Sequence, residues 1–154
     1  MKIVEFLNED AVAAELKATD KDGVIREMID LLAKAEGLRN RDEIVKVLLA
    51  RESLGSTGIG LGVGIPHGKC DAAKRLVAAF GISRKGIDFD SLDGEPVHLF
   101  FCLIAPEDSA GPHLKALARI SRLLKDKYFR DYLRTLTDDK KIYKAIKEED
   151  AKKP

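Results

Sequence analysis

The chain has three histidines, and His67 lies in the context best suited to chemistry. It stands between Pro66, whose φ is locked, and Gly68, which tolerates many backbone conformations. Glycines at positions 55, 58, 60, 62 and 64 precede it, so the loop can bring bare N–H groups close to an anion. Ser56 and Thr57 add two hydroxyl donors. The pattern predicts an anion-binding loop ending in a histidine; the alternative is a glycine-rich hairpin with an exposed histidine at its end.

Two further side chains have placements that are unusual for their type. His113 falls in the first turn of a helix predicted over 112–124, where free N–H groups and the positive end of the helix dipole favour an anion. Arg51 takes the next position on the apolar stripe of a helix predicted to begin at Asn40. The alternative for His113 is a solvent-facing first-turn histidine. The sequence does not show whether folding brings these side chains to His67.

A site built from these three side chains would suit phosphoryl transfer. Neutral imidazole is a good nucleophile toward phosphorus, and a phosphohistidine is labile enough to pass the group on. The reaction requires mainly positioning and charge stabilisation, and a guanidinium forks naturally onto phosphate oxygens. A pair of unit charges about 4 Å apart is worth about 4 kcal/mol at an effective dielectric constant of about 20. That energy is enough to hold a phosphoryl group on imidazole, so we expect no cofactor.

Other kinds of site fit the glycine loop less well. A P-loop would need glycine at position 63 and serine or threonine at position 70, where the chain has Val63 and Cys70. The third glycine of a dinucleotide fingerprint beginning at Gly58 also falls on Val63. A metal site made of His67, Cys70 and His113 has one ligand-like spacing but lacks a fourth ligand. A small metalloenzyme is therefore the weaker alternative, and we expect no metal.

The elements that must position these residues alternate between helices and strands. The first helix is predicted over 24–35 and stops at Gly37, and the second begins at Asn40, with Glu43 at the spacing of a capping box. In chain order, the hydrophobic pattern then predicts strands over 63–65, 76–83 and 97–105, followed by helices over 112–124, 128–136 and 140–147. Because the strand over 97–105 is almost continuously apolar, we expect both of its faces to be covered. His98 within it is predicted to be a structural histidine satisfied by a neighbour. The pattern predicts an α/β fold in a single domain over 1–154, with a mixed β-sheet flanked by α-helices on both faces.

Composition excludes several classes of protein. The chain has 154 residues, 45% of them hydrophobic, which is enough for one core and unlike a disordered chain. No apolar run approaches the roughly 20 residues that span a bilayer, so no direct membrane insertion is expected. The first ten residues lack the pattern of a signal peptide, which predicts a cytoplasmic protein. A net charge of +1 argues against a nucleic-acid partner, and the basic residues after position 110 are interpreted as solvated helix faces.

Two segments resemble the active-site signatures of enzyme IIA domains of the fructose/mannitol class, in the bacterial phosphoenolpyruvate-dependent phosphotransferase system. The first reads Arg51-Glu52-Ser53-Leu54-Gly55-Ser56-Thr57-Gly58-Ile59-Gly60 and continues with Val63-Gly64-Ile65-Pro66-His67-Gly68-Lys69. The second reads Ala105-Pro106-Glu107-Asp108 and continues with His113-Leu114-Lys115-Ala116-Leu117-Ala118-Arg119-Ile120-Ser121-Arg122-Leu123-Leu124. The similarity runs from about residue 24 to about residue 146. The sequence of the glycine loop and the length of the chain are most similar to those of the nitrogen-regulatory members of this class.

The resemblance implies a role for each residue of the site. His67 is expected to accept the phosphoryl group on Nε2, and His113 to donate to the phosphate or orient the imidazole. Arg51 is expected to stabilise the phosphoryl charge, with Ser56 and Thr57 as phosphate-binding loop donors. The implied fold is a mixed sheet with helices on both faces, which agrees with the hydrophobic pattern.

The resemblance also implies protein partners. The donor would be a small histidine-phosphocarrier protein (HPr- or NPr-like) that docks through an apolar patch around the acceptor histidine. Ile59, Leu61, Val63 and Phe89 are candidates for that patch, with core packing as the alternative. The chain would act in the regulatory, nitrogen branch through target proteins. The alternative is a sugar-specific IIA component that passes phosphate to a IIB domain during sugar uptake.

Overall fold

Strand β6 (Val97–Ala105) is the centre of a six-stranded sheet in the computed structural model, which describes residues 1–154. The strands follow the order β1-β5-β6-β3-β2, and β4 also pairs with β6. The other strands are β1 (Leu7–Ala13), β2 (Gly58–Gly60), β3 (Val63–Gly64), β4 (His67–Lys69) and β5 (Val77–Ile87). Strand β5 is antiparallel to β6, whereas β1 is parallel to β5 and both β3 and β4 are parallel to β6. The prediction of a mixed sheet is therefore confirmed.

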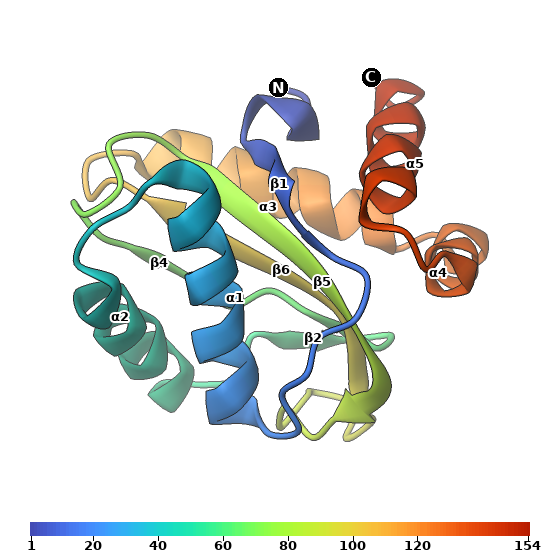
Figure 1. Cartoon of the computed structure of the whole chain (residues 1–154), viewed down its shortest axis with the longest axis horizontal. Helices are drawn as coiled ribbons and strands as arrows, with labels where there is room; N and C mark the ends of the chain where they lie inside the picture. Colours follow the sequence, from blue (N-terminus) through green and yellow to red (C-terminus); the bar gives the residue numbers. More distant parts are fainter.

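Helices cover both faces of this sheet, as predicted. In Figure 1, α1 (Lys21–Glu36) lies in front of the sheet and α3 (Ala110–Leu124) lies behind it. Helix α2 (Arg41–Ser53) packs with α1, while α4 (Lys127–Thr135) and α5 (Asp139–Ala151) pack on the side of α3. Alternate side chains of β6 enter the two cores: Leu99, Phe101 and Leu103 pack with α3, and Phe100, Cys102 and Ile104 pack with α1 and α2. This alternation explains why the strand is apolar at nearly every position.

The ends of the helices follow local chemistry, with two departures from prediction. Gly37 ends α1 with a left-handed φ of 66°, as predicted. Asn40 precedes α2, but its own φ is 57° and its side chain makes no capping hydrogen bond, so the predicted capping box is wrong. Helix α3 begins at Ala110, two residues before Pro112, which is tolerated there because the first N–H groups of a helix need no partner within it. None of the helices is both long and apolar enough to cross a bilayer.

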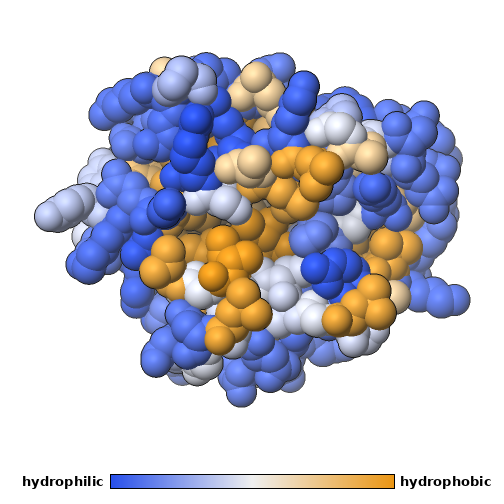
Figure 2. Space-filling view, turned by 180° about the vertical axis from the view of Figure 1, so that it is seen from behind, coloured by the Kyte–Doolittle hydropathy of each residue, from blue (hydrophilic) through white to orange (hydrophobic).

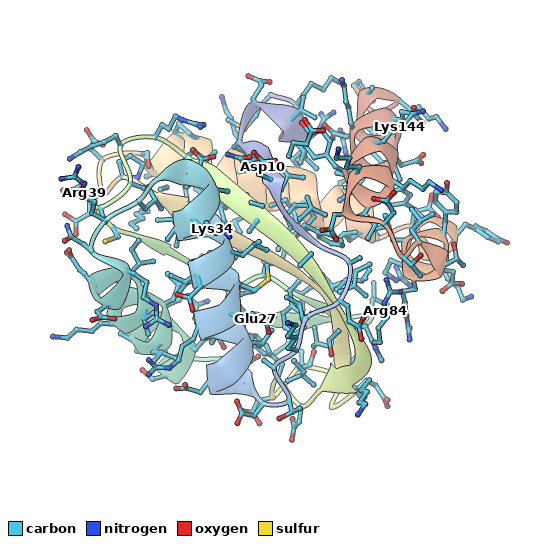
Figure 3. The ribbon with its side chains drawn as sticks, viewed as in Figure 1. Asp10, Glu27, Lys34, Arg39, Arg84 and Lys144 are labelled. Atoms are coloured by element: carbon cyan, nitrogen blue, oxygen red, sulfur yellow. The ribbon has the colours of Figure 1, made fainter.

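The N-terminal strand β1 was not predicted, because polar residues occupy its middle positions. It forms the edge of the sheet beside β5 and is fastened there by Arg84. The Arg84 guanidinium donates hydrogen bonds to the carbonyls of Ala14, Arg134 and Leu136. Figure 3 shows Arg84 between the segment after β1 and helix α4. One side chain of β5 thus joins the segment after β1 to the end of α4.

Candidate functional site

The short strand β4 positions His67 beside α2. It runs parallel to β6, with His67 opposite Leu103, and the Leu103 N–H donates to the Pro66 carbonyl at 3.0 Å. A Cβ atom on Gly68 would lie 2.9 Å from Cγ1 of Val47 and 3.0 Å from Cδ1 of Leu48, closer than real Cβ contacts. Glycine at position 68 therefore lets α2 pack directly on β4. This close approach puts the last turn of α2, and with it Arg51, next to His67.

Three of the five predicted site residues meet in one cavity of about 420 Å³. His67 comes from β4, Arg51 from the end of α2 and His113 from the first turns of α3. The remaining lining residues are Val47, Gly68, Lys69, Ala110, Leu114 and Leu117. Residues that are 62 positions apart in the chain thus form a common site, with basic groups set among apolar ones.

The hydrogen bond of His67 decides which ring nitrogen is free. Its Nδ1 lies 2.6 Å from the carbonyl oxygen of Ile65. A carbonyl can only accept, so Nδ1 carries the proton and Nε2 of the neutral ring keeps its lone pair. Burial lowers the pKa of His67, the Ile65 carbonyl opposes that shift, the Arg51 charge lowers the pKa further and the Glu52 carboxylate raises it. The ring is therefore neutral and nucleophilic at Nε2 near pH 7.

His113 is buried, and neither of its ring nitrogens has a hydrogen-bond partner. Its ring lies edge-on to that of His67, with centroids 5.3 Å apart and planes at 84°. Burial, followed by the charges of His67 and Lys69, lowers the pKa of His113 to about 4. Leaving a buried polar group unsatisfied costs about 1–3 kcal/mol. Because His113 lines the cavity, a ligand bound there could supply the missing hydrogen-bond partner.

Arg51 and Lys69 supply the positive charge of the site. One guanidinium nitrogen of Arg51 donates to the Gly55 carbonyl at 2.9 Å, and its other N–H groups make no hydrogen bond within the protein. Lys69 is exposed and lines the same cavity. Sequence reasoning did not single out Lys69, because no strand was predicted over 67–69. In the structure both residues belong to β4, and residues two apart in a strand point to the same side, so Lys69 accompanies His67.

Ser56 and Thr57 lie outside the lining of the cavity. The Ser56 hydroxyl donates to the Phe89 carbonyl at 2.6 Å and accepts from the Gly58 N–H at 2.9 Å. The buried Thr57 hydroxyl donates to the carboxylate of Glu52. Both hydroxyls are therefore engaged in bonds that shape the glycine loop.

The predicted apolar patch divides into two parts. Ile59 and Leu61 are 41% and 56% exposed, whereas Val63 and Phe89 are completely buried, so core packing is the correct interpretation for the latter two. Leu114, at the mouth of the cavity, is 68% exposed. Figure 2 shows hydrophobic side chains gathered in the middle of one face of the molecule, with hydrophilic ones around them.

The other residues considered in the sequence analysis, His98 and Cys70, lie outside the cavity. The His98 ring donates from Nδ1 to the Ser83 carbonyl at 2.9 Å, in agreement with its structural interpretation. Cys70 is buried and free, and it does not line the cavity. No group of three or more His, Cys, Asp or Glu side chains is arranged to hold a metal ion. The metal-site alternative therefore has no geometric support.

The family model described as "Phosphoenolpyruvate-dependent sugar phosphotransferase system, EIIA 2" matches residues 5–149. The chain belongs to this family. This IIA chain is 40% identical over 146 residues to a nitrogen regulatory protein of Bradyrhizobium diazoefficiens, covering 95% of both proteins. It is also 39% identical over 150 residues to a fructose-specific EIIABC component of Bacillus subtilis, covering 97% of this chain and 24% of that protein.

A crystal structure of the nitrogen regulatory protein IIA-Ntr from Neisseria meningitidis has a similar fold, with a TM-score of 0.85 and 32% sequence identity. The match covers 92% of this IIA chain and 97% of that one. The fold and the family expected from the two signature segments are therefore confirmed.

Proposed function

We propose that this IIA chain is a phosphoryl carrier of the phosphotransferase system and that Nε2 of His67 accepts the group. The observation that carries the proposal is the bond from Nδ1 of His67 to the Ile65 carbonyl, which leaves Nε2 unprotonated within a cationic cavity. The family of the chain supports a phosphotransfer role. No bound cofactor is needed, because the donor itself carries the phosphoryl group.

The step requires only in-line transfer between two imidazoles. The Nε2 lone pair of His67 attacks phosphorus, a new N–P bond forms, and the N–P bond of the donor phosphohistidine breaks. The electron pair of that bond returns to the imidazole of the donor. Nδ1 of His67 keeps its proton, so the Ile65 carbonyl stabilises the positive charge that the ring gains. Reversal of the same step passes the group on.

The neighbouring groups have distinct roles in this scheme. Arg51 has free N–H donors for the phosphate oxygens, and Lys69 adds a second charge at the cavity. His113 has two unpartnered ring nitrogens, and the one that carries the proton can donate a hydrogen bond to a phosphate oxygen. Ser56 and Thr57 would have to give up their present bonds to reach a phosphate, so we assign their hydroxyls to the shape of the glycine loop.

The proposed partners are proteins. A histidine-phosphocarrier protein would supply the group, and the exposed Leu114, which lines the cavity, offers it an apolar contact, with the exposed Ile59 and Leu61 as further candidates. We place the chain in the regulatory branch, where target proteins read its phosphorylation state. The nitrogen regulatory relative matched over 95% of both lengths favours this branch. The similarity to a fructose-specific component supports the alternative, in which the chain transfers its phosphoryl group to a IIB domain. We propose a cytoplasmic location and no nucleic-acid partner.

The proposal can be tested by reconstituting the relay. The purified chain is mixed with labelled phosphoenolpyruvate, enzyme I and a phosphocarrier protein, and the label on the chain is measured. We expect one acid-labile, alkali-stable phosphate on the wild type and none on His67→Ala. An unlabelled wild type, or a fully labelled His67→Ala variant, contradicts the proposal. Incubation of the phosphorylated chain with IIB proteins separates the branches, because a regulatory member retains its phosphate.

A further inference from the structure

Glu52 is a buried carboxylate next to Arg51 in the last turn of α2. Its residue is only 7% exposed, and a helix C-terminus is an unfavourable place for a negative charge. Burying such a charge costs several kcal/mol unless it is paired and hydrogen-bonded. Its two oxygens accept from the Thr57 N–H at 3.2 and 3.3 Å, and one of them also accepts from the Thr57 hydroxyl. The hydrogen bonds from Thr57 therefore offset part of the cost of burying this charge beside the candidate site.

The countercharge comes from a different part of the chain. Lys21, the first residue of α1, places its Nζ 3.0 Å from the Glu52 carboxylate and 3.4 Å from that of Asp90. The same ammonium group lies 4.9 Å from the centroid of the Phe89 ring, a cation–π contact. The Lys21–Glu52 pair thus connects the start of α1 with the end of α2 and with the glycine loop.

A continuous hydrogen-bond path leads from this pair to the imidazole of His67. Glu52 accepts from the Thr57 N–H, and the Thr57 carbonyl accepts from the Ile65 N–H at 3.0 Å. The Ile65 carbonyl in turn accepts from Nδ1 of His67 at 2.6 Å. Because the N–H and C=O groups of Thr57, and those of Ile65, lie on either side of one Cα atom, this path fixes the positions of its members mechanically.

The same carboxylate is also linked to the guanidinium of the site. Arg51 donates to the Gly55 carbonyl, and Glu52 binds Thr57 two residues further on. Two adjacent side chains of α2 therefore hold the same loop at neighbouring points. A shift of Glu52 would move the loop, the carbonyl that orients His67 and the end of α2 that presents Arg51.

We propose that Glu52, paired with Lys21, is a positioning residue for phosphoryl transfer: through Thr57 and Ile65 it holds the His67 ring with Nδ1 protonated and Nε2 free. This inference rests on the proposed function of His67. Glu52 touches no reacting atom; it acts through the loop and the strand that it holds. Glu52 also raises the pKa of His67, against the larger effect of burial, which lowers it.

The test is a nitrogen NMR titration of His67 in the full chain, in which Glu52→Gln keeps the shape of the side chain but removes its charge. We expect a lower pKa for His67, a mixture of ring tautomers in place of the Nδ1–H form, and phosphorylation slower by between about tenfold and a hundredfold, the range for a displaced reacting group. Arg51, Lys69 and His113, which face His67 from α2, β4 and α3, are unchanged in this variant.

Asp90→Asn is the matched control, because Asp90 also pairs with Lys21 but does not contact Thr57. It should leave the tautomer, the pKa and the phosphorylation rate of His67 at wild-type values. Lys21→Met removes the countercharge of Glu52 and replaces Glu52→Gln as the test variant if that protein does not fold. It should shift the tautomer of His67 and slow the phosphoryl transfer as Glu52→Gln does.

The outcomes separate this inference from the proposed function. If Glu52→Gln and Lys21→Met lower the melting temperature but keep the wild-type tautomer, pKa and rate, Glu52 has a structural role only and the inference is overturned. If the wild type takes no phosphate on His67, the proposed function fails, while the tautomer measurement still decides whether Glu52 orients the ring.

Discussion

The His113 ring meets the His67 ring edge-on, with 5.3 Å between their centroids, and it has no hydrogen-bond partner on either nitrogen. Burial disfavours the charged form of both rings, and the charge of His67 further opposes protonation of His113. Both pKa values are lowered, that of His113 to about 4. The unphosphorylated site therefore contains two neutral imidazoles, one with a free lone pair and one with unused polar atoms.

Replacing His113 should separate stability from function. We expect His113→Leu to raise the free energy of unfolding by about 1 kcal/mol, because the change removes buried polar atoms that have no partner. The same variant should accept the phosphoryl group much more slowly, because the phosphate loses a donor. Urea unfolding and the labelling assay measure the two effects.

His98→Leu is the control for this prediction. The His98 ring donates to the Ser83 carbonyl, so its loss should destabilise the protein by about 1 kcal/mol. If His113→Leu destabilises the chain as much as His98→Leu does, the ring nitrogens of His113 are hydrogen-bonded in the folded protein and the prediction is wrong.

The pH dependence of stability follows from the same burial. An unfolded histidine titrates near its ordinary pKa of about 6.5, whereas His113 titrates at about 4 in the folded chain. Between these values the unfolded state binds more protons, so stability falls as the pH is lowered from about 7 to about 4. The pKa difference sets an upper limit of about 3 kcal/mol on the contribution of His113, and His67 adds to it in the same direction.

Urea unfolding at a series of pH values measures this loss. His113→Leu should flatten the profile below pH 7, leaving the smaller contribution of His67. A profile that is equally steep in the wild type and the variant would show that the acid sensitivity arises elsewhere in the chain.

The sequence was sufficient for the helices and for three of the six strands, β3, β5 and β6, because their hydrophobic patterns are strong. Strands β2 and β4 were not predicted, because a three-residue segment that contains glycine is too short to show a period. Strand β6 has the predicted bounds, and Gly37 ends α1 as expected. Strand β1 escaped prediction because Asn8, Glu9 and Asp10 interrupt its apolar pattern at the edge of the sheet. A strand is predicted from an alternation of apolar and polar residues, and the polar middle of this edge strand breaks that alternation.

The site was predicted less completely, for a different reason. His67, His113 and Arg51 were recognisable by their placement and by their signatures, but their meeting depends on the pairing of β4 with β6 and on close packing at Gly68. Hydroxyl donors in a loop look alike in sequence, whether they face a ligand or their own backbone. Thr57 is bound to Glu52, a tertiary pairing that sequence spacing alone does not reveal.

Lys69 should influence His113 and the bound phosphoryl group through its charge. Its ammonium group contributes to the low pKa of His113, after burial and the charge of His67. We therefore expect Lys69→Gln to raise the pKa of His113 and to slow phosphoryl acceptance, because one of the two cations at the cavity is lost. An NMR pH titration and the labelling assay provide the measurements. Lys74→Gln, which removes an exposed charge outside the cavity, should change neither; an equal effect of both variants would mean that only the net charge matters.

Gly68→Ala should uncouple α2 from the site. The added Cβ would lie 2.9 Å from Cγ1 of Val47, so α2 must move away from β4, at a cost of about 1–3 kcal/mol, as for other overpacked positions. Since Arg51 is one turn further along α2, its guanidinium should retreat from His67, and phosphorylation should slow more than the loss of stability explains. Gly111→Ala is the matched control: apart from its chain neighbours nothing lies near the added Cβ, and the residue is in α3, so the contact between α2 and β4 and the phosphorylation rate should be unchanged. If Gly68→Ala keeps wild-type stability and rate, the contact between α2 and β4 is looser than the structure indicates, and the placement of Arg51 does not depend on it.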